Sequence, residues 1–344
     1  MPRATIDDVA KLAGVSIKTV SRVVNREPNV RQSTRDRVDR AITQLNYKPN
    51  LSARSLASQR SHLIGLIYDD PSAYEVPSSG YVIRMQEGTL RACRATNYEL
   101  LIHPCDYRRR DVRQDLQGLI ERSQPDGIVL APPLSNMRKI VAAVAATGTR
   151  FVRVAPGTEA LPEFVVATDD REISAEMTRY LASLGHRRIG FIAGDRRHKA
   201  VVNRLPGYRD GLEESGLAYA DELVADGDNS IGSGEAAAEQ LLALDDPPTA
   251  LFAANDDMAA GVIRVAYRLG LDVPGRLSVA GFDDSALARL VYPALTTIRQ
   301  PLSKMAERAA VDLIERFGKP DSEPRTVVIP STLQIRESTG PAPS

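Results

Sequence analysis

The chain has 344 residues, 43% of them hydrophobic, and its 44 Lys and Arg balance 44 Asp and Glu. This length can hold more than one domain with its own core, and two cysteines, Cys93 and Cys105, are too few for a disulfide scaffold. The longest apolar runs, such as Leu63–Tyr68, are far shorter than the roughly 20 residues of a membrane span, and no leader opens the chain. These features predict a cytoplasmic protein and exclude the disulfide-stapled and membrane-spanning classes.

The segment that begins at Thr5 has apolar residues with helical spacing, at Ile6, Val9, Ala10 and Ala13. Gly14 is expected to end this helix, because glycine tolerates the left-handed backbone of a tight turn. Ser16 can cap a second helix, from Ile17 to about Asn25. A third helix, about Ser33 to Leu45, is expected to start with a capping box of Ser33 and Asp36.

The second helix has two different faces. Its apolar side holds Val20, Val23 and Val24, and its opposite side holds Ile17, Lys18, Ser21, Arg22 and Asn25. This pattern is typical of a helix-turn-helix whose second helix reads a major groove, although an ordinary solvated helix surface is the alternative. Residues 1–60 contain twelve Lys and Arg against five Asp and Glu, a net charge of +7 in a neutral chain. That asymmetry favours a polyanionic partner.

Several motifs carry a family resemblance: Thr5-Ile-Asp-Asp-Val-Ala-Lys-Leu-Ala-Gly-Val-Ser-Ile-Lys-Thr-Val-Ser-Arg-Val-Val-Asn25, then Thr34-Arg35, Leu45-Asn-Tyr-Lys-Pro-Asn50 and Ala53-Arg-Ser-Leu-Ala57. Together they resemble the LacI/GalR family of bacterial transcription regulators, and the resemblance continues to about Arg336. It implies a DNA-binding domain at residues 1–49 and a hinge helix at residues 50–60. In that hinge, Leu56 would enter the minor groove and unstack one base step, whereas from the residues alone it is equally an ordinary packing leucine.

The resemblance also assigns the DNA contacts. Ile17, Lys18 and Arg22 are predicted to read base edges, with Lys or Arg favouring guanine and Ile17 contacting a thymine methyl group. The remaining predicted contacts, mostly to phosphates, are Thr5, Ser16, Thr19, Ser21, Asn25, Thr34, Tyr47 and Ala53.

From His62 onward, strand-like and helix-like segments alternate. Strands are predicted at 63–68, 98–103, 127–130, 151–154, 165–167, 188–193, 223–225, 250–253, 278–282, 295–298, 326–329 and 333–335, and helices at 84–95, 111–122, 137–146, 173–184, 204–215, 233–244, 256–269 and 305–316. This alternation predicts an α/β fold with doubly wound parallel sheets in two lobes. The resemblance implies a periplasmic-binding-protein-like effector and dimerisation domain at 61–344. Lobe 1 would span about 61–166 and 299–336, and lobe 2 about 167–298.

Polar residues follow several predicted strands, where doubly wound sheets bind their ligands. Asp70 follows the first strand, and Asn255 and Asp283 follow strands of lobe 2. Arg204 opens a helix, and Arg153 is a charge within an apolar strand that is best satisfied at the same sheet edge. Such groups can hydrogen-bond vicinal hydroxyls or a carboxylate, and two arginines favour an effector with some negative charge.

In the family pattern, Arg204, Asn255 and Asp283 match positions that bind effector. The loop from Pro71 to Tyr81 is longer than in that pattern, and Asp169-Asp170-x-x-Ile173 replaces a more typical Asp-Asn-x-x-Gly. Ser72 and Tyr81, from the longer loop, complete the predicted effector set.

Structural roles compete for some of these polar residues. Asp256 and Asp284 precede helical segments and are interpreted as N-caps, and Asp69 and Asp70 can equally form a turn. His186 follows a helix and is interpreted as part of its C-cap, without a functional role.

Phosphate-loop, nucleophile-elbow and zinc-helix motifs are absent, and the four histidines lack metal-ligand spacing, so no catalysis, cofactor or metal is predicted. The prediction is a homodimeric repressor of near-palindromic operator DNA, controlled by a sugar or sugar acid bound between the lobes. The alternative is a solute-binding protein or a glycoside-active enzyme without a regulatory role. The tail after Arg336 has no heptad pattern and is expected to be disordered.

Overall fold

The computed structural model describes residues 4–24, 29–47, 60–69, 80–157, 164–197, 199–317 and 325–343. Its contacts divide the chain into two compact units, Met1–His62 and Leu63–Ser344. Several predictions lie outside the described residues: the hinge helix with Ala53 and Leu56, and the single residues Asn25, Asp70 and Ser72.

The first unit is a small bundle of three helices, α1 (Ile6–Ala13), α2 (Ile17–Val24) and α3 (Gln32–Leu45). Its core is built from apolar residues of all three helices, including the fully buried Val9, Val20 and Val38. Gly14 ends α1 with a φ of 63°, and the Ser16 hydroxyl accepts a hydrogen bond from the Thr19 amide at 3.2 Å. The predicted helix-turn-helix is therefore present.

The capping box in this unit is not where the sequence placed it. The Thr5 and Asp8 side chains form one at the start of α1, with Thr5 N to Asp8 Oδ2 at 2.9 Å. The box predicted at Ser33 is wrong, because α3 begins at Gln32 and Arg31 at its N-cap provides no side-chain hydrogen bond. The Gln32 amide instead donates to the Asp36 carboxylate at 2.8 Å, which engages the acid that Ser33 was expected to use.

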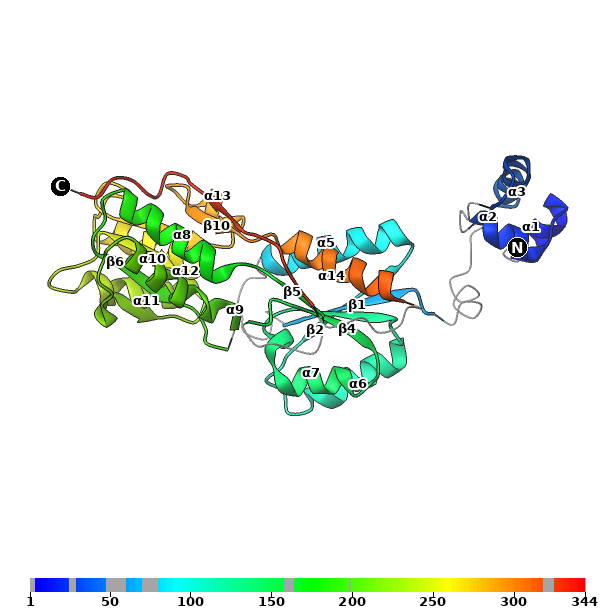
Figure 1. Cartoon of the computed structure of the whole chain (residues 1–344), viewed down its shortest axis with the longest axis horizontal. Coiled ribbons are helices and arrows are strands. Elements are labelled where there is room, and N and C mark those ends of the chain that lie inside the picture. The colour runs from blue at the N-terminus through cyan, green and yellow to red at the C-terminus, as the bar shows by residue number, and fades with distance from the viewer. Residues whose placement is uncertain are drawn as a thin grey trace. The chain divides into compact units, whose positions relative to one another are not determined.

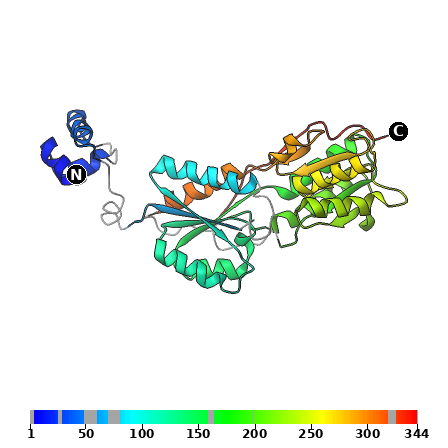
Figure 2. The same ribbon diagram turned by 180° about the vertical axis from the view of Figure 1, so that it is seen from behind.

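The described part of the second unit contains two six-stranded sheets, one in each lobe (Figure 1). Lobe 1 has the order β11-β5-β4-β3-β1-β2, formed by β1 (Leu63–Asp69), β2 (Glu99–Cys105), β3 (Gly127–Leu130), β4 (Arg150–Val154), β5 (Phe164–Ala167) and β11 (Thr326–Val328). All its neighbouring strands are parallel. One face carries α5 (Gly80–Thr96) and α14 (Leu302–Arg316), and the other carries η2 (Leu134–Asn136), α6 (Val112–Ser123) and α7 (Arg138–Ala145), as Figure 2 shows from behind.

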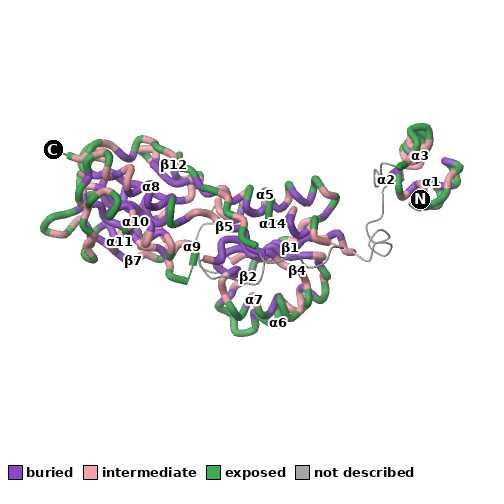
Figure 3. Tube along the Cα trace, in the orientation of Figure 1, coloured by how far each residue is buried: buried purple, intermediate pink, exposed green. Residues whose placement is uncertain are grey.

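Lobe 2 has the order β12-β10-β9-β8-β6-β7, formed by β6 (Ile189–Ala193), β7 (Val224–Asp226), β8 (Ala250–Ala253), β9 (Ser278–Phe282), β10 (Thr296–Arg299) and β12 (Thr332–Gln334). The helical segments are α8 (Asp170–Ser183), α9 (Lys199–Val202), α10 (Arg204–Glu214), η3 (Asp221–Leu223), α11 (Ile231–Leu242), α12 (Asp256–Arg268) and α13 (Leu287–Leu290). α8 packs on α10 and α11 on α12, and the strands between them are buried (Figure 3). The predicted α/β class with parallel sheets is confirmed. In the described chain, no helix has both the length and the apolar character needed to cross a bilayer.

The described chain passes between the two sheets three times, between β5 and α8, between β10 and α14, and between β11 and β12. The last passage corrects a prediction. The strand at 333–335 was expected to return to lobe 1, within the range 299–336, but β12 pairs antiparallel with β10 in lobe 2. Its residue Leu333 aligns with Ile298 and thereby covers an edge of β10 that would otherwise be open.

The tail after Arg336 is ordered in the structure, so the expectation of disorder is wrong. Ser338 is fully buried, and its carbonyl accepts a hydrogen bond from the Val279 amide at 2.8 Å. Further along, the Ala342 amide donates to the Leu184 carbonyl at 2.9 Å. His186 is buried with its Nε2 3.1 Å from the Gly340 carbonyl. Its role is structural, but the C-cap of the preceding helix is Leu184, so His186 stabilises the tail instead.

We predict that Ser338→Ala destabilises the protein. The Ser338 hydroxyl donates to the Val279 carbonyl at 2.6 Å and accepts from the Thr296 amide at 2.8 Å, so the variant removes a partner from two buried groups. Each such loss costs about 1–3 kcal/mol in the free energy of unfolding, measured by denaturant titration. Thr332→Ala, at an exposed hydroxyl, is the control and should stay within about 0.5 kcal/mol of wild type. Equal effects of the two variants would contradict a stabilising tail.

Candidate DNA-reading face and effector site

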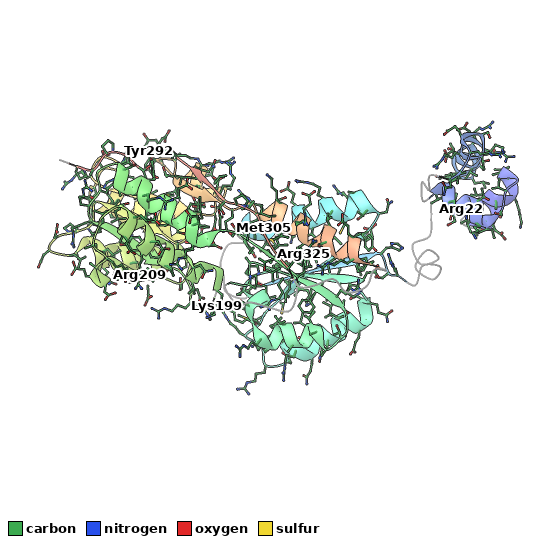
Figure 4. The ribbon with its side chains drawn as sticks, viewed as in Figure 1. Arg22, Lys199, Arg209, Tyr292, Met305 and Arg325 are labelled. Atoms are coloured by element: carbon green, nitrogen blue, oxygen red, sulfur yellow. The ribbon has the colours of Figure 1, made fainter. Side chains whose placement is uncertain are left out.

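The exposed side of α2 is the candidate DNA-reading face. Val20 and Val23 are buried against the head core, whereas Lys18 and Arg22 are exposed and the Ile17 side chain is 47% exposed. Arg22 lies on the surface of the head unit in Figure 4. Two long cationic side chains and one apolar side chain on an eight-residue helix can meet base edges and a thymine methyl group.

The other described DNA candidates surround this face or serve the local fold. Ser16 is exposed and Thr19 is half-buried at the start of α2, with their hydroxyls 2.9 Å apart, where helix N–H groups can meet a phosphate. The Thr5 hydroxyl is occupied in the capping box, donating to Asp8 at 2.7 Å. The last three are half-buried: Ser21 on α2, Thr34 in the first turn of α3, and Tyr47, whose pKa burial raises. Their DNA contacts remain predictions.

Arg204, the first residue of α10, is the centre of the candidate effector site. Its side chain is only 3% exposed, with the guanidinium 3.5 Å from the centroid of the Phe282 ring. Its Nε donates to the Asp170 carboxylate at 3.2 Å and its Nη1 donates to the Ala254 carbonyl. Gly207 permits this arrangement, because a Cβ there would overlap the Arg171 carbonyl and push α10 away from α8.

Asp283 follows β9, as predicted, and its Oδ1 lies 3.9 Å from Nη1 of Arg204. Its backbone has a φ of 117°, held by a 2.8 Å hydrogen bond from its amide to the Ile298 carbonyl. The Gln300 side chain donates to the Asp283 carboxylate. Burial raises the pKa of Asp283 to about 6, although Arg204 acts in the opposite direction. The structure therefore brings two predicted site residues, Arg204 and Asp283, together.

Asn255 is also close, but its side chain has a backbone role. It is the N-cap of α12, its Oδ1 accepting from the Met258 amide at 2.9 Å and its Nδ2 donating to the Asn229 carbonyl at 2.9 Å. The interpretation of Asp256 as an N-cap is therefore wrong. Its buried carboxyl group hydrogen-bonds with the Thr297 hydroxyl at 2.5 Å instead.

Asp284 is not an N-cap either, since α13 begins only at Leu287. It is fully buried and forms ion pairs with Arg299 at 2.6 Å, Arg336 at 2.5 Å and Arg289 at 3.3 Å. One carboxylate thus joins the end of β9 to the end of β10, to α13 and to the segment after β12.

Lobe 1 contributes Tyr81 from α5. Its buried hydroxyl has no hydrogen-bond partner among the described residues. Burial raises the pKa of this phenol well above its usual value, and the carboxylates of Asp283 and Asp69 raise it further. Arg153 is buried in β4, where its Nε donates to the Ser135 carbonyl, and its effector role remains a prediction.

Asp170 was missed as a site residue. It lies three residues after the end of β5, as the first residue of α8, so the strand-end rule that found Asp283 could have found it as well. Its carboxylate lies 3.2 Å from Arg204, so this arginine, one of the two predicted to favour an effector with some negative charge, already has an acidic partner inside the protein.

Two known families match parts of the sequence. Residues 5–50 match the bacterial regulatory proteins of the lacI family, and residues 178–339 match the periplasmic binding protein-like domain. The chain is 37% identical over 308 residues to the HTH-type transcriptional regulator GalR of Escherichia coli (strain K12), covering 89% of this chain and 87% of that protein. It is 33% identical over 344 residues to the HTH-type transcriptional regulator DegA of Bacillus subtilis (strain 168), covering 98% and 99%.

Solved structures share the fold over almost the whole chain. A transcriptional regulator CelR–cellobiose complex is 30% identical with a TM-score of 0.75, and a lac repressor dimer bound to operator and the anti-inducer ONPF is 25% identical with a TM-score of 0.79. Each match covers 98% of this chain and 100% of the other. The head and the two-lobed body thus define a DNA-binding transcription regulator. The chain belongs to the lacI family of bacterial regulatory proteins.

We predict that Asp256→Asn flattens the pH dependence of stability. Burial, and secondarily Asp283, raises the pKa of Asp256 from 3.8 to about 8, so the folded state binds this proton more tightly than the unfolded state does. The resulting stabilisation is complete below pH 3.8 and is lost as pH rises through about 8. Thermal unfolding of full-length protein should show a smaller fall in Tm from pH 5 to 9 in Asp256→Asn than in wild type. Parallel Tm curves would show that Asp256 is already ionised in the fold.

Proposed function

We propose that this protein is a repressor that binds near-palindromic operator DNA as a homodimer and responds to a small-molecule effector between its lobes. The exposed face of α2, with Ile17, Lys18 and Arg22 opposite a buried apolar side, is the observation that carries the proposal. The named relatives are transcriptional regulators, which supports regulation rather than catalysis. Such a protein acts in the cytoplasm, where the operator DNA lies.

Each head would place α2 in a major groove of one half-site. Lys18 and Arg22 can donate to guanine O6 and N7, and Ile17 can contact a thymine methyl group. The hydroxyls of Ser16 and Thr19 at the start of α2 would bind phosphate and fix the register of the helix. Base contacts supply sequence preference, and the net charge of +7 in residues 1–60 supplies salt-dependent affinity.

A sugar is the effector class that the site supports. Asp283 accepts hydrogen bonds, Arg204 donates them, and the Tyr81 hydroxyl, which has no partner in the described part of the chain, can do both, which suits neighbouring sugar hydroxyls. The CelR relative was solved with cellobiose, which agrees with this class. Arg153, Asn255, Asp70 and Ser72 stay in the proposed set on the sequence argument.

Effector binding has a direct route from one lobe to the other. Arg84 on α5 of lobe 1 donates to the Asp284 carbonyl. Asp284 directly follows Asp283, the residue that is proposed to bind the effector. An effector that draws Asp283 toward Tyr81 would therefore change the contact between the lobes. The sign of control depends on which arrangement of the lobes the DNA-bound dimer prefers.

A second copy of the chain would cover apolar residues on lobe 2. Tyr292 is 90% exposed and Leu290 is 79% exposed around the end of α13, and Tyr267 is 86% exposed on α12, which packs against α13. Tyr292 projects from the outer surface of lobe 2 in Figure 4. Exposed aromatic and aliphatic side chains mark a protein interface where they form one patch, and we propose that Leu290 and Tyr292, two residues apart, belong to such a patch. The structurally similar lac repressor is described as a dimer.

We predict that Lys18→Ala costs about 1–3 kcal/mol at one base pair of the operator half-site, because one base contact is lost. Binding to a set of operators with single base changes, measured at fixed salt, should lose discrimination at that position only. Arg40→Ala, at an exposed arginine of α3, is the charge-matched control and should retain discrimination. Uniform weakening by Lys18→Ala across all sequences would make Lys18 a phosphate contact.

We predict that Asp283→Asn leaves operator binding intact and abolishes the effector response. Asparagine tolerates the positive φ of this position but lacks the carboxylate that accepts two ligand hydrogen bonds. Operator release or retention would be measured in fluorescence anisotropy with each of a panel of sugars. Asp226→Asn, at an exposed carboxylate that ends β7, is the control and should respond like wild type. A full response by Asp283→Asn would remove Asp283 from the site.

A further inference from the structure

The ion pair between Asp170 and Arg204 is buried, with side chains only 5% and 4% exposed. Asp170 opens α8 and Arg204 opens α10, so the pair joins two helices that pack closely together. The Ala254 carbonyl and the Phe282 ring hold the other side of the guanidinium. Arg204 is therefore fixed in position, and a carboxylate inside the protein already balances its charge.

A second carboxylate shares the same guanidinium. Asp283 lies 3.9 Å from Arg204, and its exposed fraction of 27% makes it the more accessible of the two acids. The other described groups that act on Asp283 are the Asp257 carboxylate and the neutral Gln300 amide, with Asp256 and Tyr81 in turn affected by Asp283. Within this described set Arg204 is the one cation that acts on Asp283, because Arg299, Arg336 and Arg289 pair instead with the neighbouring Asp284.

We propose that Asp170 determines the charge preference of the effector site: by balancing Arg204, it makes the site select a neutral polyhydroxy compound over the matching carboxylate. This inference rests on the proposed effector function. A ligand carboxylate placed against Arg204 would lie beside Asp283 in a poorly solvated site, where like charges repel strongly. Ligand hydroxyls avoid that repulsion, since they can donate to Asp283 and accept from the remaining N–H groups of Arg204. The preference for neutral ligands thus comes from repulsion between a ligand carboxylate and Asp283.

The Asp170→Asn variant tests the charge of this side chain while keeping its shape. The variant keeps the size of the side chain and an oxygen that can accept from Nε of Arg204, but it leaves the guanidinium charge unbalanced by this residue. If Asp170 only stabilised the packing of α8 on α10, the substitution would lower the affinity for neutral and anionic ligands by the same factor.

The test measures ligand affinity by isothermal titration calorimetry on the full-length protein. The probes are two matched pairs, galactose with galacturonate and glucose with glucuronate, at pH 7.5. Wild type should bind the neutral member of a pair at least tenfold more tightly. In Asp170→Asn, the ratio of sugar affinity to uronate affinity should fall at least tenfold, mainly because the uronate binds more tightly. Asp210→Asn removes an exposed ion pair with Arg171 between the same two helices and should leave the ratio unchanged.

Three outcomes would overturn the proposal. The first is a wild-type protein that binds a uronate as tightly as the matching sugar, a result that needs no variant. The second is an Asp170→Asn protein that still binds operator but loses affinity for both members of a pair equally. The third is a wild-type protein that binds no probe, which would also overturn the sugar class in the proposed function. The first two outcomes leave that function standing.

Discussion

The effector lobe depends on one buried guanidinium. Arg204 begins α10 and contacts the start of α8 through Asp170, the end of β8 through the Ala254 carbonyl, and β9 through the Phe282 ring. A charge this deeply buried is tolerated only when its partners are in place, so each partner fixes the others. The same contacts hold Asp283 at the end of β9, and the geometry of the candidate site is therefore part of the stability of the lobe.

Asp284 continues this arrangement toward the other lobe. Its carboxylate pairs with Arg299, which ends β10 just before the chain leaves for α14, and with Arg336, which follows β12. Its carbonyl accepts from Arg84 of lobe 1. Neighbouring residues thus have different surroundings: Asp283 belongs to the proposed effector site, and Asp284 is bound to segments that join the lobes. A ligand at the proposed site would act on Asp284 through a single peptide unit.

Local pattern in the sequence was enough for the three head helices and for the alternating strands and helices, because each buries a periodic apolar face. Local pattern failed where contacts with residues distant in the sequence determine the structure. Strand β12 has three residues and no usable period, and it belongs to lobe 2 only because β10 has an open edge there. The polar tail is ordered for the same reason, through buried partners on β9. At the site, a strand end predicted Asp283, and a helix start together with the family resemblance predicted Arg204. The pairing of Arg204 with Asp170 joins two helices that are distant in the sequence, and no local pattern predicted it.

The three passages between the sheets restrict how the body can move. Two lobes joined by one segment can rotate relative to each other about any axis through that segment. Three segments allow the lobes to bend toward each other but oppose sliding and twisting of one lobe against the other. Effector binding in this chain would accordingly produce one reproducible hinge motion. The same geometry makes the crossing segments poor places for insertions, because lengthening one of them would misalign the other two.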